Sequence, residues 1–98
     1  MLFQKSANQG EVLAQTNLAL LYLSGEAVEK NEKTAFEWLE KASIQGFHAA
    51  QYQLGNLYEA GIGVEKDQQK AIHWYEQASN QGYERAKLKL EELKKNKS

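Results

Sequence analysis

The chain has 98 residues and a net charge of −1, so it has no overall field that would attract nucleic acid or an anionic membrane. It has no cysteine, which excludes disulfides and thiolate metal sites, and no proline, which favours helices joined by short connections. No apolar run approaches the ~20 residues that span a bilayer, and the first residues are not a basic segment followed by an apolar one. As written, we expect a cytoplasmic chain without nucleic-acid or membrane partners, unless an upstream signal has been removed.

The sequence repeats with a shift of 36 residues. Residues 14–50 and 50–86 agree at 17 of 37 aligned positions. A unit of this size with helical patterning is too small to bury its own apolar face and must stack on a neighbour. The repeat therefore predicts an all-α fold, an α/α solenoid of antiparallel helix pairs.

The first complete unit, residues 14–49, reads as two helices with one apolar stripe each. The stripe residues are Ala14, Leu18, Leu21 and Tyr22 in the first helix, and Ala35, Trp38, Leu39 and Ala42 in the second. The first helix ends near Gly25. The second begins at Asn31, a residue typical of helix N-caps, and ends at Gly46.

The second unit, residues 50–85, repeats this pattern. Its stripes are Ala50, Leu54, Leu57 and Tyr58, then Ala71, Trp74, Tyr75 and Ala78. Its helices end at Gly61 and Gly82, with Asp67 as the second N-cap. Because the aromatic residues recur at one register, we assign them to the core rather than to a cofactor or base-stacking site.

Partial copies flank the two units. Residues 5–10 match residues 41–46, so we expect a helix over 2–8, a turn at Gly10, and a partial repeat over 1–13. Residues 86–95 continue the period as a capping helix with many lysines and glutamates, polar where no further repeat follows. The whole chain, 1–98, is then one domain.

The second unit is similar to the Sel1-like repeat family, which is related to tetratricopeptide repeats. The matching residues are Ala50 to Val64 (AQYQLGNLYEAGIGV), Asp67, Lys70, Ala71, Trp74, Tyr75, Ala78, Gln81 and Gly82. The resemblance implies a non-enzymatic adaptor that binds a protein or peptide partner on a concave surface lined by the first helix of each pair.

The first unit departs from this pattern at three places. Ala19 stands for Gly55, Leu39 for Tyr75, and Glu26–Ala27 for Ile62–Gly63. Glycine tolerates a positive φ that costs alanine about 1–2 kcal/mol, so we expect the loop around Ala27 to differ from the loop around Gly63.

Residues that could carry chemistry have simpler interpretations. His48 and His73 lie on different predicted helices, and neither has a second ligand at metal spacing. The glutamates lie among lysines and glutamines on polar helix faces. We therefore predict no catalytic residue, no cofactor and no metal.

A hydrolase-like accessory is the alternative enzymatic hypothesis, because some cysteine-rich proteins of similar repeats have been linked to penicillin binding and hydrolysis. The serine enzymes use Ser-x-x-Lys for this reaction. No serine of this chain has a lysine three residues later, and the chain cannot form that subset's disulfides.

The residues off the apolar stripe of each first helix are the candidate partner-binding set. They are Thr16, Leu20 and Leu23, then Tyr52, Asn56 and Glu59, then Leu88, Glu92 and Lys95. Leu20 and Leu23 make their helix apolar nearly all round, so something should cover them. The cover is a partner segment, a second copy in a weak homodimer or self-associating structural unit, or the helix 2–8 folded back.

Overall fold

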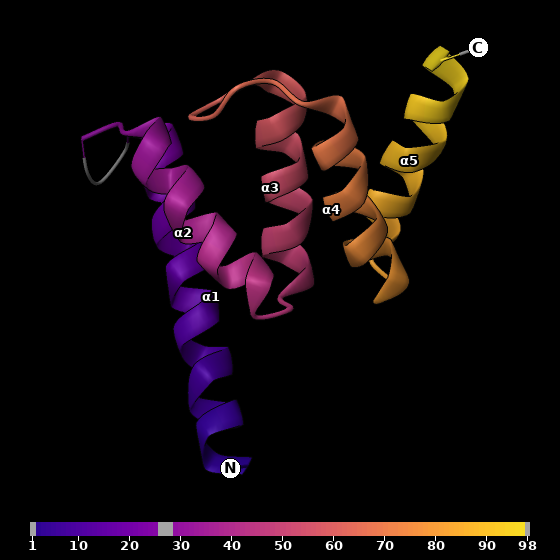
Figure 1. Ribbon diagram of the computed structural model, residues 1–98. Coiled ribbons are helices and arrows are strands. Elements are labelled where there is room, and N and C mark those ends of the chain that lie inside the picture. Colours follow the sequence, from indigo (N-terminus) through magenta and orange to yellow (C-terminus); the bar gives the residue numbers. More distant parts are fainter. Residues whose placement is uncertain (1, 26–28, 98) are drawn as a thin grey trace.

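The computed structural model describes residues 2–25 and 29–97, and these contain five helices and no strand. The helices are α1 (Leu2–Ser24), α2 (Glu32–Ile44), α3 (His48–Ala60), α4 (Gln68–Asn80) and α5 (Glu84–Lys97). Each packs mainly against the helix before and after it in the chain (Figure 1). The molecule measures 45 × 34 × 18 Å. The all-α solenoid that the repeat predicts is confirmed.

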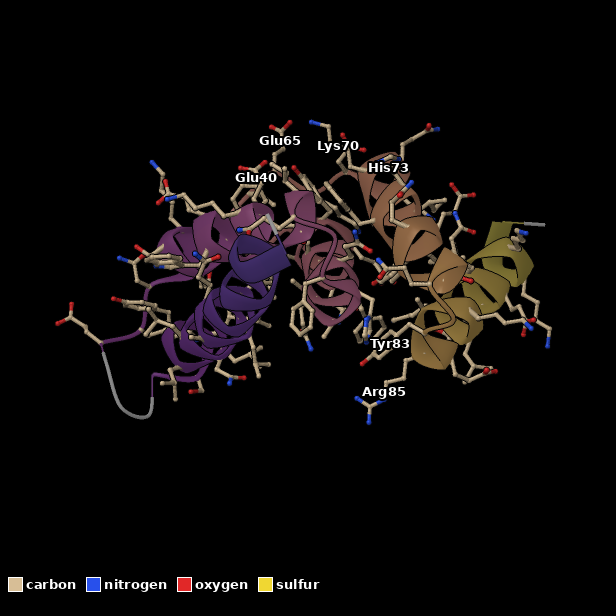
Figure 2. All side chains as sticks on the ribbon, turned by 90° about the horizontal axis from the view of Figure 1, so that it is seen from below. Glu40, Glu65, Lys70, His73, Tyr83 and Arg85 are labelled. Atoms are coloured by element: carbon tan, nitrogen blue, oxygen red, sulfur yellow. The ribbon has the colours of Figure 1, made fainter. Side chains whose placement is uncertain are left out.

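The helices form two layers. We call α1, α3 and α5 the A helices, and α2 and α4 the B helices. Figure 2 shows Glu40, Lys70 and His73 projecting on the B side, while Tyr83 and Arg85 project on the opposite side. None of the described helices is both long and apolar enough to cross a bilayer.

Side-chain caps fix where the B helices begin. The Asn31 side chain accepts a hydrogen bond from the Thr34 backbone N–H (3.0 Å), and Asp67 accepts one from the Lys70 N–H (3.1 Å). Each side chain pairs a backbone donor that has no partner within the helix. Both predicted N-caps are confirmed.

The core runs along both layers. The repeat residues that are fully buried in this core are Ala35, Leu39, Ala42, Ala50, Leu54, Ala71, Tyr75, Ala78 and Ala86. Trp38 and Trp74 are only partly buried and pack against this core from its edge. The prediction that these indole rings fill the core is therefore wrong; the neighbouring Leu39 and Tyr75 fill it.

Gly55 lets α4 approach α3 closely. A Cβ at residue 55 would lie 2.6 Å from Cε1 of Tyr75, so an alanine there would collide with the buried ring. The first unit has Ala19 and Leu39 at the two corresponding positions, and both are fully buried. The two departures from the repeat are thus one paired change. The second unit places glycine against the large tyrosine ring, whereas the first unit places the larger alanine against the smaller leucine.

The N-terminal helix differs from the prediction. A turn was expected at Gly10, as at Gly46 and Gly82, which have φ of 94° and 88°. Instead α1 continues through Gly10, and its N-terminal half extends past the other helices (Figure 1). The fold-back of residues 2–8, one of the three alternatives for covering Leu20 and Leu23, is therefore wrong.

The residue after the glycine explains this difference. In the two turns that form, Phe47 and Tyr83 follow the glycine and pack against the core. The backbone N–H of each also donates to a carbonyl five residues earlier, Ala42 or Ala78, which closes the turn. Glu11 stands at this position in α1. A glutamate favours continued helix and has no apolar side chain to anchor the turn.

The predicted stripe of α1 is consequently not buried as predicted. Ala14 is exposed and Leu21 is 36% exposed, whereas Val12, Thr16 and Ala19 are buried. The expected difference in the loop at Ala27 falls on residues 26–28, which lie outside the described residues.

We predict that Gly55→Ala destabilises the fold by about 1–3 kcal/mol, because the buried Tyr75 ring cannot move away. In a Tyr75→Leu background the same change should cost nothing or stabilise, as the leucine reproduces the first unit. Urea unfolding of the two single variants and the double variant measures this coupling. Equal cost in both backgrounds would contradict the paired interpretation.

We also predict that Glu11→Phe introduces a turn at Gly10, because it supplies the apolar anchor present at Phe47 and Tyr83. NMR chemical shifts of residues 9–11 should then lose their helical values. Glu11→Gln, which removes only the charge, is the control and should stay helical. A helical Gly10 in the phenylalanine variant would show that the residue after the glycine does not decide the turn.

Candidate functional site

The candidate surface is the exposed side of the A helices. Among its residues, those of α3 and α5 are joined by direct contacts. Lys89 Nζ on α5 lies 3.3 Å from Glu59 Oε1 on α3, and the same ammonium lies 3.8 Å from Glu92 Oε1. Because Lys89 and Glu59 are each only 29% exposed, this pair is less screened by water than a fully exposed one. The two A helices therefore present one continuous polar strip.

A buried tyrosine holds this strip from below. Tyr75 Oη lies 2.6 Å from Asn56 Oδ1 and 2.6 Å from Glu59 Oε1. Burial, and then the hydrogen bond to Glu59, raises the pKa of Tyr75, so the phenol stays protonated and acts as a donor. The carboxylate of Glu59 is thereby fixed between a phenol of α4 and an ammonium of α5.

The shared phenol leaves Asn56 with hydrogen-bonding capacity. A hydroxyl has one proton, so Tyr75 donates to Glu59 or to Asn56 at any moment. Rotating the Asn56 amide by 180° lets its Nδ2 donate to Tyr75 Oη while Glu59 accepts the phenol proton. In either orientation one end of the partly exposed amide can pair with a group outside the protein.

An aromatic cluster borders the polar strip. The Tyr52 ring lies 5.8 Å from the Tyr75 ring and 5.3 Å from the Tyr83 ring, measured between centroids, and His48 lies 4.9 Å from Tyr83. His48, Tyr52 and Tyr83 are partly exposed. Partly exposed rings that pack at tilted and edge-to-face angles are suited to contact apolar groups of a partner.

The structure connects four of the nine candidate residues, Tyr52, Asn56, Glu59 and Glu92, through Tyr75 and Lys89. Tyr52, Asn56 and Glu59 lie on α3, and Glu92 reaches them through Lys89. Leu88 is 57% exposed and occupies the α5 position equivalent to Tyr52. Lys95 is exposed and lies about one turn beyond Glu92 on α5.

The three α1 candidates behave differently. Thr16 is 3% exposed and its hydroxyl donates to the Val12 carbonyl at 2.8 Å, so its prediction as a contact residue is wrong. The helix places it toward α2 instead of toward solvent. Leu20 is 37% exposed and Leu23 is partly buried against the core. Both leucines lie on α1, which packs against α2.

The sequence did not indicate Tyr83, His48 or Lys89 as part of the candidate partner-binding surface. Tyr83 could have been found, since an aromatic residue follows the turn glycine at both Phe47 and Tyr83. Lys89 carries no such signal, because its pairing with Glu59 depends on how α5 crosses α3.

We next consider whether the rest of the described surface carries a metal-binding cluster or a pocket. His73 is exposed, as its place in the repeat predicts, and its ring packs edge-on against Trp74. In the described part of the chain no three histidine, aspartate or glutamate side chains gather at metal-binding distance. A hollow of about 440 Å³ on α2 is lined by Glu37, Trp38, Glu40 and Lys41, with Lys41 Nζ 5.1 Å from the Trp38 ring centroid.

The sequence matches the family model described as Sel1 repeat over residues 1–11, 12–47 and 48–83. A search of curated protein sequences finds no match. Among solved structures, a Sel1 repeat protein from Oxalobacter formigenes is 47% identical with a TM-score of 0.80. That similarity covers 83% of this chain and 61% of the other.

Two further solved structures are similar. A protective antigen of uropathogenic Escherichia coli, described as displaying an SLR fold, is 36% identical with a TM-score of 0.72 over 82% of this chain. Cysteine rich protein B of Helicobacter pylori is 26% identical with a TM-score of 0.75 over 85% of this chain. The chain spans 17% and 62% of these two proteins, so it corresponds to part of each.

We predict that Tyr75→Phe lowers stability at pH 7 by about 1–3 kcal/mol, because Asn56 and Glu59 lose their shared donor. The folded-state pKa of Tyr75 is raised above the ordinary value near 10, so its contribution is present below pH ~10 and falls as pH rises. The stability difference between the parent and the variant should therefore shrink above pH ~10. Urea titrations from pH 7 to 11 test this, and a constant difference would show that the phenol does not stay protonated.

Proposed function

Because this chain belongs to the Sel1 repeat family, whose members generally act as protein-interaction modules, we propose that it is an adaptor that binds an extended peptide segment of a protein partner. The proposed site is the A-helix surface of α3 and α5. The observation that carries this proposal is the Tyr75–Glu59–Lys89 contact chain, which joins three helices beneath that surface. A surface fixed before binding loses less conformational freedom when the partner binds.

The chemistry of the strip favours an extended backbone with apolar side chains. The Asn56 amide can pair with one backbone N–H or C=O of a peptide. Tyr52, Tyr83 and Leu88 offer partly or fully exposed apolar surface on either side. Glu59 and Glu92 surround the single ammonium of Lys89, which favours a peptide that also carries a positive charge. Two A helices offer only a small contact area, for which we expect affinities on the micromolar scale.

Self-association is the second candidate function, and the exposed apolar residues of α1 favour it. Leu13 is 50% exposed and Leu21 is 36% exposed. These residues lie on the α1 end of the array, away from the strip on α3 and α5, so the two functions can be tested separately.

We predict that peptides selected from a random displayed library bind the parent protein and lose about tenfold in affinity to Leu88→Glu. The charge would stand in the apolar part of the strip without a partner, and tenfold corresponds to about 1.4 kcal/mol. Fluorescence anisotropy with a labelled selected peptide measures this.

Ile44→Glu is the matched control. Ile44 is also an exposed aliphatic residue, at 72%, but it lies at the end of the B helix α2. It should leave the affinity unchanged. Equal loss in both variants, or loss only in Ile44→Glu, would place peptide binding elsewhere on the molecule.

A further inference from the structure

Four partly exposed side chains share one face of α3. They follow one another at intervals of four, four and three residues, which is the spacing of a single helix face, and they are His48, Tyr52, Asn56 and Glu59. With a rise of about 1.5 Å per residue, Tyr52 and Glu59 are about 10 Å apart along the helix axis. A peptide that lies along this face therefore meets aromatic rings at one end, an amide in the middle and a carboxylate at the other end.

The ring end of this face is suited to proline. The Tyr52 ring lies 5.8 Å from the Tyr75 ring and 5.3 Å from the Tyr83 ring, at interplanar angles of 47° and 64°. Tyr52 and Tyr83 are partly exposed, so both offer aromatic surface to a partner. Proline-rich segments dock on aromatic-lined surfaces in the polyproline II conformation, which is already formed in the free peptide.

The amide in the middle suits the backbone of such a segment. Asn56 Oδ1 lies at the Tyr75 hydroxyl, so Nδ2 of the same amide is the end that can donate to a peptide. Polyproline II has no internal hydrogen bonds, and its carbonyl groups are available as acceptors. Proline itself lacks a backbone N–H, so a donor on the protein is the group that its backbone can use.

The carboxylate end is suited to a basic side chain. Tyr75 Oη and Lys89 Nζ both contact Oε1 of Glu59, at 2.6 and 3.3 Å. A carboxylate has about four lone-pair sites, so Glu59 can accept a further donor. Glu92, whose side chain is 65% exposed, adds a second carboxylate 3.8 Å from the same ammonium. Two carboxylates against one ammonium favour a lysine or arginine of the partner.

The separation of the two ends selects a backbone conformation. Polyproline II rises about 3.1 Å per residue with three residues per turn, so residues i and i+3 project on the same side about 9 Å apart. This separation matches that of Tyr52 and Glu59 along α3. Three residues of a β-strand also span about 10 Å, but residues i and i+3 then project to opposite sides. Only the polyproline II peptide can direct both side chains to the protein at this spacing.

We propose that the partner segment is a polyproline II peptide that lies along α3. A proline packs against Tyr52 and Tyr83, and a lysine or arginine three residues away lies beside Glu59 and Glu92. This inference rests on the proposed adaptor function and narrows the class of peptide that the adaptor binds. The spacing is the same for both chain directions, so a probe peptide carries a lysine on each side of its prolines.

Three fluorescein-labelled synthetic peptides test the proposal by fluorescence anisotropy. KALPALPALK has a lysine three residues outside each proline. AKLPALPAKL has the same composition, with this spacing changed to two residues, and KALAALAALK has no proline. We expect KALPALPALK to bind with a Kd on the micromolar scale, and each of the other two peptides to bind about tenfold more weakly or worse.

Variants of the protein assign the two preferences to the two ends of the face. Tyr52→Leu keeps an apolar side chain without the ring, and should abolish the preference for KALPALPALK over KALAALAALK. Glu92→Gln should reduce the preference over AKLPALPAKL and keep the preference for proline. Trp74→Leu, at a partly buried ring of the B helix α4, is the control and should leave all three affinities unchanged. Urea unfolding measures whether each variant is folded.

Equal affinity for the three peptides, or no binding of KALPALPALK, would overturn the proposal. A preference for proline that survives Tyr52→Leu would overturn it as well. Peptides selected from the random library separate this outcome from the adaptor function. If they bind the parent and weaken with Leu88→Glu while KALPALPALK fails, the adaptor function stands with another class of peptide. If both fail, both proposals are overturned.

Discussion

The arrangement of the second unit depends on the buried side chain of Tyr75. Its ring fills the space that Gly55 leaves on α3, and its hydroxyl contacts Asn56 and Glu59 on the same helix. Glu59 in turn pairs with Lys89 on α5. Ring packing sets the distance between α3 and α4, while the hydroxyl aligns polar groups that reach the surface. One residue thus links core packing to the candidate binding strip.

The first unit packs its two helices together with apolar side chains at the corresponding positions. Leu39 replaces Tyr75, and three of the positions that contact Tyr75 change to small or apolar residues: Ala19 for Gly55, Leu20 for Asn56, and Leu23 for Glu59. A leucine has no hydroxyl, so a polar residue at position 20 or 23 would gain no internal partner. Differences between units at these positions therefore reflect internal complementarity as well as any partner. Asn56 and Glu59 serve the fold through Tyr75, and in the proposed function their outward groups also contact the partner.

Features that depend on local sequence within one repeat unit could be predicted. Features that depend on how neighbouring helices pack could not. The repeat, the N-caps Asn31 and Asp67 and the turn glycines Gly46 and Gly82 follow from local patterns, and the structure confirms them. The exposure of Leu21 could not be read from its identity with Leu57, because burial requires a helix on the outer side. The pairing of Lys89 with Glu59 likewise depends on helix crossing. The continuous α1 agrees with the presence of Glu11 after Gly10, where Phe47 and Tyr83 follow the turn glycines; an alignment of the glycines alone does not show this difference.

The two ends of the array differ in chemistry, and this difference bears on assembly. On α5 the positions equivalent to Gln51, Gly55 and Tyr58, which would face a further B helix, are Lys87, Glu91 and Lys94. Charged side chains there are well solvated, so this face of α5 does not require a covering helix. On α1 the outward positions keep the apolar residues of an internal repeat. Leaving such a face in water forfeits the burial that stabilises every other inter-repeat contact. Any self-association of the chain is therefore expected to involve α1 rather than α5.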